Sequence, residues 1–147
     1  MALTIEQVRM FMLDHEPAKN ILLDDNEFTD GEITQAQTFV TDAYNAMPPP
    51  LSLATAADFP NNYLLLMGVT AYLMKSAAFR QIRNQATAQD GDVAPIGVDD
   101  KQSIYKAYGQ ELWQEFLEAS RQYKIATNLQ SAYGEMSSGY RSVGRRW

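Results

Sequence analysis

Cysteine is absent from the sequence, and histidine occurs once, as His15. Without cysteine the chain can form neither a disulfide bond nor a thiolate metal site, a composition that fits a reducing compartment. His15 and its neighbour Glu16 could act as a base, but they precede Pro17 in a segment that we interpret as a solvated loop. The chain also lacks the P-loop, dinucleotide-binding, zinc-protease and serine-hydrolase motifs. We therefore predict that the protein is not an enzyme and needs no cofactor or metal.

Clusters of acidic residues do not change this prediction. In the calcium-loop pattern counted from Asp24, Phe28 and Thr29 stand where a ligand and the glycine belong. A count from Asp90 fails in a similar way. Three glutamates share one face of the last predicted helix: Glu111, Glu115 and Glu118. Because no histidine accompanies them, they indicate a solvated face rather than a dimetal site.

Basic residues are scarce overall but concentrated at one end. The chain has 12 Lys and Arg against 18 Asp and Glu, a net charge of -6, which argues against a general nucleic-acid binder. Residues 1–58 hold ten acidic residues against Arg9 and Lys19, a net charge of -8. Residues 133–147 hold three arginines against Glu135, a net charge of +2. The sequence is therefore acidic in front and basic at its tail.

A hydrophobic run long enough to cross a membrane is also missing. Residues 60–74 contain no charge, but the uninterrupted part, 63–74, is shorter than the roughly 20 residues of a span, and Gly68 and Thr70 interrupt it. Residues 1–14 are charged and periodic, unlike a signal peptide. We expect no contact with a membrane.

The charge-free run predicts instead the central helix of a bundle, within Phe59 to Gln85. A helix that is apolar nearly all round must be covered by other segments or other chains. We place Pro60 in its first turn, where the missing N–H costs nothing, and consider Asp58 and the following asparagines as caps. We expect Tyr63 to Phe79 to be the most buried span, with Gly68 at a close contact.

Three further helices complete the prediction. Capping boxes at Thr4 and Thr29 begin helices that reach about Asp14 and Met47, the second stopped by three prolines. After a loop over 86–99, the longest helix covers about 101–129. The expected buried faces are Ile5, Val8, Phe11 and Met12; Ile33, Ala36, Val40, Ala43, Tyr44 and Met47; and Tyr105, Tyr108, Leu112, Phe116, Ala119, Tyr123 and Ala126. Gly109 would allow a close helix contact. The predicted fold is an all-α bundle of about four helices over 1–132, followed by an extended C-terminal arm over 133–147.

The arm combines glycines and serines with arginines and aromatics. It could be a frayed tail, an arm that grips nucleic acid, or an arm that docks on a partner protein. We favour docking, because the acidic body opposes nucleic-acid binding and the arm has too few apolar residues to fold alone. The expected partner-binding residues are Tyr133, Tyr140, Arg141, Arg145, Arg146 and Trp147.

The predicted elements follow a definite order: a capped short helix precedes EFTDGEI, a helix ending in PPP, a long apolar helix, a loop, a long aromatic helix and a basic tail. This layout resembles the head–tail connector (head-completion, or adaptor) proteins of tailed bacteriophages. The resemblance implies a structural virion protein whose subunits form a ring, commonly a dodecamer, at the neck. It implies binding to the portal protein through the arm and to tail or neck proteins, with DNA passing through without sequence-specific binding. An acidic lumen would let the duplex slide.

Two other functions stay open. Another neck or baseplate structural adaptor could have the same build, and only its neighbouring proteins would distinguish it. A cellular helical-bundle regulator that binds a ligand in its core predicts a monomer or dimer and an apolar cavity between the helices.

Overall fold

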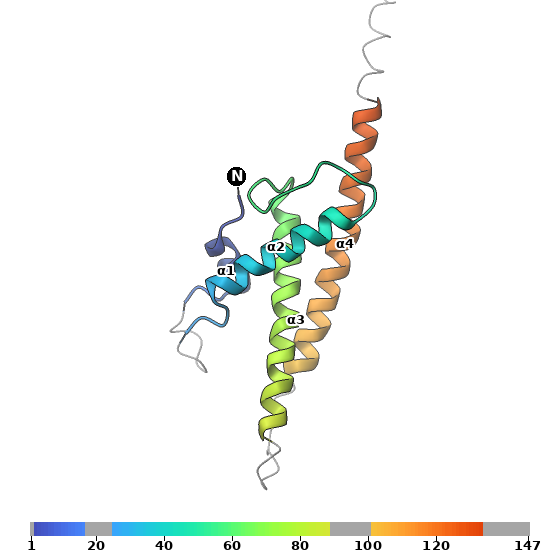
Figure 1. The fold of residues 1–147 in the computed structure, drawn as a ribbon. Coiled ribbons are helices and arrows are strands. Elements are labelled where there is room, and N and C mark those ends of the chain that lie inside the picture. Colours follow the sequence, from blue (N-terminus) through green and yellow to red (C-terminus); the bar gives the residue numbers. More distant parts are fainter. Residues whose placement is uncertain (1, 17–24, 89–100, 134–147) are drawn as a thin grey trace, which may run out of the picture.

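The computed structural model describes residues 2–16, 25–88 and 101–133, and over these ranges it contains four α-helices and no strand. In chain order the helices are α1 (Ile5–Met12), α2 (Asp30–Ala46), α3 (Asn62–Ala88) and α4 (Lys101–Tyr133). Helices α3 and α4 pack against each other in opposite directions as a long hairpin, α2 crosses this pair, and α1 lies beside the start of α2 (Figure 1). The prediction of an all-α fold with about four helices is confirmed. The predicted arm beyond Tyr133 lies outside the described residues.

Both predicted capping boxes are present. Thr4 Oγ1 accepts a hydrogen bond from Gln7 N (3.2 Å), and Gln7 Oε1 accepts one from Thr4 N (3.0 Å). Thr29 and Glu32 form the same reciprocal pair at the start of α2. Each pair satisfies amide groups that the first helical turn leaves without partners. Because these bonds join residues three apart, the local sequence was enough to predict both helix starts.

Other helix ends differ from the prediction. Leu13 adopts the left-handed conformation (φ 58) and ends α1 before the expected Asp14. Pro60 is not in the first turn of α3. Asn61, one of the predicted cap candidates, caps this helix, because its Oδ1 accepts hydrogen bonds from Tyr63 N (2.9 Å) and Leu64 N (3.4 Å). Residues 86–88, expected in a loop, continue α3, and α4 extends past 129 to Tyr133.

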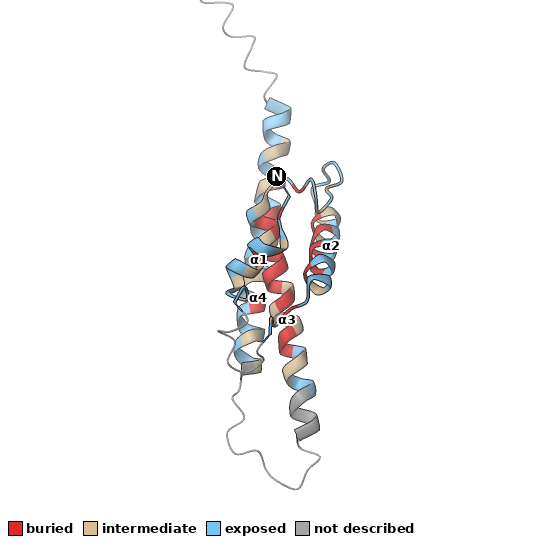
Figure 2. Ribbon diagram, turned by 90° about the vertical axis from the view of Figure 1, so that its left-hand side faces the viewer, coloured by how far each residue is buried: buried red, intermediate tan, exposed pale blue. Residues whose placement is uncertain are grey.

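The core lies where α1, α2 and α4 surround the part of α3 from Leu64 to Ala78. Leu65 and Val69 are fully buried, and Figure 2 shows the buried residues of α3 concentrated along this part of the helix. The two ends of the predicted most-buried span are wrong, because Tyr63 is 61% exposed and Phe79 is 70% exposed. Helix α3 has 27 residues, whereas α1 has 8 and α2 has 17, so these shorter helices cannot cover it from end to end.

Two glycines of the hairpin sit at close contacts. A Cβ atom at Gly68 would collide with Val40 of α2 and lie 3.1 Å from the Phe116 ring of α4. The neighbours there are side chains of α2 and α4, so the predicted close contact at Gly68 is present. A Cβ atom at Gly109 would lie 3.3 Å from both the carbonyl oxygen of Ala71 and the amide nitrogen of Lys75. The predicted close helix contact at Gly109 is therefore confirmed.

The predicted buried faces are correct for α2 and partly wrong for α1 and α4. In α2, four of the expected side chains are buried: Ile33, Ala36, Val40 and Tyr44. In α1, Phe11 is exposed because it lies at the edge of the face centred on Val8. In α4, Tyr108 and Ala126 are exposed. The buried residues of α4 are Gly109, Phe116, Ser120 and Lys124.

Candidate interaction surfaces and the buried polar groups

The predicted partner-binding residues fall mainly outside the described part of the chain. Tyr133 is the last residue of α4, and its side chain is 63% exposed. The other five lie beyond the described ranges: Tyr140, Arg141, Arg145, Arg146 and Trp147. The first residue of the predicted arm is thus helical and solvent-accessible, and the docking role of the arm stays a prediction.

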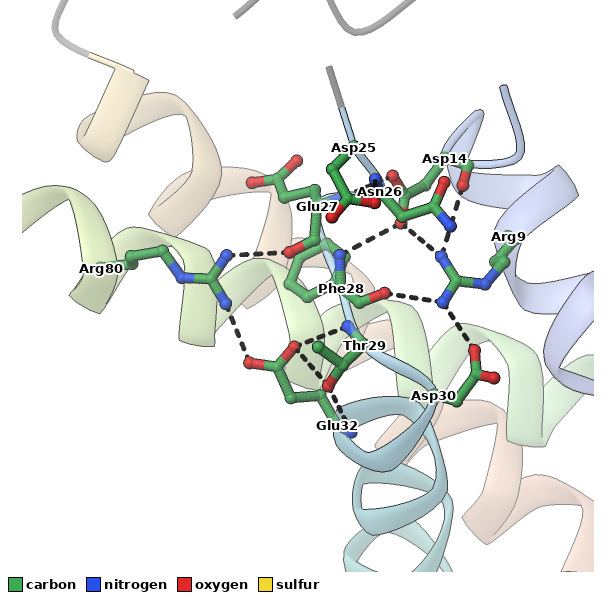
Figure 3. A network of polar contacts seen from close by, with 10 residues as sticks. All are labelled: Arg9, Asp14, Asp25, Asn26, Glu27, Phe28, Thr29, Asp30, Glu32 and Arg80. Atoms are coloured by element: carbon green, nitrogen blue, oxygen red, sulfur yellow. Dashed lines mark hydrogen bonds and ion pairs between the residues drawn. The ribbon is translucent and has the colours of Figure 1, made fainter. Parts of the chain in front are cut away.

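Arg9 holds the segment before α2 against α1 (Figure 3). Its guanidinium donates hydrogen bonds to Asp14 Oδ2 (3.1 Å), to the carbonyl oxygen of Phe28 (2.8 Å) and to Asp30 Oδ1 (2.7 Å). The Asp14 carboxylate also accepts bonds from the amides of Glu27 (2.7 Å) and Phe28 (3.2 Å). The side chains of Arg9 and Asp14 are only 11% and 9% exposed. The described end of the acidic stretch is therefore bound to a nearly buried ion pair through the backbone amide of Glu27.

Arg80 of α3 closes the same segment from the other side. It donates to the carbonyl oxygen of Glu27 (2.9 Å) and to Glu32 Oε1 (2.9 Å), and it stands 5.7 Å from the Phe28 ring. The hydrogen bond from the Thr29 amide, helped by the Arg80 charge, lowers the pKa of Glu32. Phe28, 2% exposed, is enclosed by this network. We define these contacts around residues 25–30 as the clasp, which joins α1, α2 and α3.

Lys124 is a buried cation that sequence reasoning missed. It is 1% exposed, and its Nζ donates to the carbonyl oxygens of Tyr44 (2.6 Å) and Met47 (2.7 Å) at the end of α2. The ammonium also lies 4.4 Å from the centre of the Tyr44 ring. It is a second donor to the Tyr44 carbonyl, which also accepts from Met47 N (3.2 Å), and it satisfies the Met47 carbonyl. The charge also complements the negative end of the helix dipole. The sequence signal was its position four residues after Ser120 and eight after Phe116, on one helix face.

These buried groups form no evident catalytic arrangement. Burial lowers the pKa of Lys124, but two carbonyls occupy its protons and the side chain is closed to solvent. Burial, with a smaller effect of Tyr123, raises the pKa of Tyr44. The hydroxyls of Tyr44, Thr70 and Ser120 are buried and make no hydrogen bond within the described ranges.

The single histidine lies at the surface: His15 Nε2 is 3.3 Å from Glu16 Oε1, with both side chains exposed. The described residues hold no group of three or more His, Asp or Glu side chains arranged to bind a metal.

The α3–α4 hairpin carries most of the exposed large apolar side chains. Eight of the thirteen such residues in the described ranges lie on these two helices: Tyr63, Phe79, Ile82, Ile104, Tyr108, Ile125, Leu129 and Tyr133. We call the end of the hairpin where α3 stops and α4 begins its free end. Near this end, Ala78, Phe79 and Ile82 line a groove of about 260 Å³. A wider hollow of about 740 Å³ lies beside Pro48 and the C-terminal half of α4. Exposed apolar side chains that line a groove are typical of binding sites.

Together the fold and these surfaces define an all-α protein built on a long antiparallel hairpin whose apolar side chains extend into solvent. The chain matches no protein-family model, no curated protein and no solved structure. Within the described part of the chain, none of the helices has the length and hydropathy that a membrane span requires.

Proposed function

We propose that the protein is a structural virion component, a ring-forming head–tail connector that joins the portal of a tailed bacteriophage to its tail or neck. The observation that carries this proposal is the set of exposed apolar side chains along the α3–α4 hairpin, including Phe79 and Tyr108. The order of elements and the charge distribution of the sequence support the connector class in particular. In this proposal the protein resides at the neck of the virion.

The exposed apolar residues favour assembly because only contact with another chain can remove them from water. Apolar surface removed from water contributes about 25 cal/mol per Å², so each large side chain left exposed is a potential contribution to an interface. The clasp and the Lys124 contacts stabilise the single chain without using the hairpin's outer surface. A subunit built in this way can fold first and then use that surface to bind its neighbours.

The arm over 133–147 provides the proposed contact with the portal protein. Its aromatic residues would anchor it, because buried Trp and Tyr contribute most to interfaces, whereas exposed arginine pairs contribute roughly 0–1 kcal/mol each. In a pull-down with purified portal, truncation after Ala132 should abolish or sharply weaken binding. Trp147→Ala should weaken it more than Arg145→Ala. Equal binding by the truncated and full-length chains would contradict the portal contact.

The negative charge of the chain predicts a weak affinity for DNA. The net charge of -6 should repel phosphates, so the isolated subunit should bind duplex DNA weakly at physiological salt. This property suits a conduit through which DNA passes without sequence-specific binding. A tight binding isotherm with a steep dependence on salt would count against it, because that slope reports phosphates neutralised by cations.

A ligand-binding cellular regulator is the second candidate, and the groove beside Phe79 is the observation that favours it. Its volume of about 260 Å³ is just below the usual range of roughly 300–1,000 Å³ for small-molecule pockets. Another neck or baseplate adaptor shares the features that support the connector. Identifying the proteins that copurify with assembled particles would separate these adaptors from a connector.

A further inference from the structure

The groove near the free end of the hairpin has an apolar floor and a basic rim. Ala78, Phe79 and Ile82 of α3 provide the apolar part, and Lys75 and Lys106 provide the cations. Lys75 Nζ is held 4.6 Å from the centre of the Trp113 ring, and Lys106 is exposed. The described residues that line the groove include no carboxylate. An occupant should therefore combine an apolar side chain with negative charge.

The solvent face of α4 has that chemistry. Tyr108, Glu111 and Glu115 follow one another at spacings of three and four residues, so they share one side of the helix. Tyr108 is 58% exposed, and both glutamates are exposed. Ile104, one turn earlier, extends the apolar part. We call Ile104, Tyr108, Glu111 and Glu115 the α4 stripe.

We propose that the α4 stripe of one subunit binds in the Lys75–Lys106 groove of a second copy of this chain. Tyr108 covers Phe79 and Ile82, and the glutamates pair with the two lysines. The α4 side of the groove, Gln102 to Gln110, spans about 12 Å, which matches the roughly 10 Å from Tyr108 to Glu115, and Ile104 would extend beyond this part of the groove. This contact rests on the proposed function, for which it supplies the subunit interface.

The two surfaces lie on different sides of the same helix. Lys106 precedes Tyr108 by two residues, which places them on nearly opposite sides of α4. One chain can therefore offer its stripe to one neighbour while its groove accepts another. Such a heterologous contact produces a closed ring if the rotation closes, and an open helical filament if it does not. An isologous dimer would instead use the same patch on both chains.

A second copy fits both surfaces better than the C-terminal arm does. The arm has three arginines that could pair with Glu111 and Glu115, but only Glu135 to offer to the lysines of the groove. A second copy satisfies the stripe and the groove in one contact. Truncation after Ala132 should therefore leave self-association unchanged, and loss of self-association in the truncated chain would overturn this assignment.

Charge reversal tests the contact in the full-length chain by sedimentation velocity over a range of concentrations. Lys106→Glu damages only the groove, and the double change Glu111→Lys with Glu115→Lys damages only the stripe. Each variant should lose self-association by roughly tenfold or more, because like charges then face each other. Asp42→Lys, an exposed reversal on α2, is the matched control and should assemble like wild type. Circular dichroism checks that every variant is folded.

Mixing the two damaged variants gives the sharpest outcome. In the mixture, the unchanged stripe of one variant meets the unchanged groove of the other, and the reversed stripe meets the reversed groove, which also have opposite charges. The mixture should therefore assemble, although neither variant assembles alone. A chain carrying all three reversals should regain self-association. Monomeric wild type at every concentration, or a mixture that contains only monomers, would overturn the contact.

This experiment and the portal pull-down can fail independently. Assembly through the stripe and groove without portal binding would leave the contact standing and remove the connector function. Portal binding by a wild-type chain that does not self-associate would leave a portal-binding protein and remove the contact.

Discussion

Phe28 and Phe79 show how differently two regions of this molecule use the same side chain. In the clasp, Phe28 is 2% exposed and lies between Arg9 and Arg80, whose guanidinium groups bond to the backbone around it. At the free end of the hairpin, Phe79 is 70% exposed beside a basic groove. The first ring stabilises the single chain. The second contributes little to the fold and is available to a partner, so the two regions separate folding from assembly.

The largest effect should come from removing each ring in turn. Phe28→Ala should lower the free energy of unfolding by about 3–5 kcal/mol, because it leaves a cavity in a closed site. Phe79→Ala should change it by less than about 0.5 kcal/mol, as is usual for surface positions. Urea unfolding followed by circular dichroism, at concentrations low enough to avoid association, measures both. Similar losses of unfolding free energy in the two variants would contradict the proposal that Phe28 stabilises the fold and Phe79 serves assembly.

Arg9→Ala should be the next most damaging change. It removes bonds to Asp14, Asp30 and the Phe28 carbonyl, and it leaves the nearly buried Asp14 carboxylate without its cation, held only by backbone amides. We expect a loss of about 2–4 kcal/mol in the same unfolding experiment, since breaking a buried ion pair strands one charge. Arg121→Ala, an exposed arginine on α4, should lie within about 0.5 kcal/mol of wild type. A loss for Arg9→Ala as small as that of this control would show that the clasp is not needed for the fold.

Two glycines should respond to alanine with opposite signs. Gly68→Ala places a methyl group against Val40 and Phe116 and should cost about 1–3 kcal/mol despite the better helix propensity of alanine. Gly31→Ala, with its nearest neighbour 4.0 Å away at Thr29 Oγ1, should be neutral or stabilising by up to about 1 kcal/mol. Thermal unfolding resolves the difference. If Gly68→Ala were stabilising, the packing of α2 and α4 across α3 would be looser than the structure indicates.

The smallest effect concerns pH and Lys124. Burial lowers its pKa below the ordinary 10.5, so the unfolded chain binds more protons between the lowered value and 10.5. Wild-type stability should therefore rise with pH through this window, by about 1.4 kcal/mol for each unit by which the pKa is lowered. The difference between wild type and Lys124→Met should show this rise below the tyrosine pKa of about 10. Lys75, whose pKa burial also lowers, is common to both chains. A difference that stays flat with pH would refute the burial of a charged lysine.

The sequence predicted those features of the fold that depend on residues close together in the chain. Thr4 and Thr29 predicted their helix starts because a capping box is complete within four residues. The charge-free sequence around Leu65 and Val69 predicted the centre of the core, because a run of apolar residues is also a local signal. The exposure of both ends of the predicted buried span was missed, because it depends on the lengths of the helices that cover α3.

The polar contacts could not be predicted in this way. Arg80 bonds to Glu27 across 53 positions of sequence, and Lys124 bonds to Tyr44 across 80. The burial of Lys124 depends on carbonyl groups at the end of α2, and the periodicity of α4 contains no information about them. Of the predicted partner-binding residues, the structure describes Tyr133 alone, as an exposed helical residue. The groove beside Phe79 was missed because its walls come from two helices, with residues such as Phe79 and Lys106 far apart in the sequence.

The proposed assembly requires that the exposed surface of the α3–α4 hairpin forms the contact between subunits. Sedimentation velocity of wild type and Phe79→Ala at matched concentrations tests this with a variant that should keep its fold. We predict that wild type sediments as an assembly of several chains and that Phe79→Ala shifts toward the monomer with an unchanged circular dichroism spectrum. Identical sedimentation of the two chains, whether as monomers or as assemblies, would contradict the assignment of this surface to assembly.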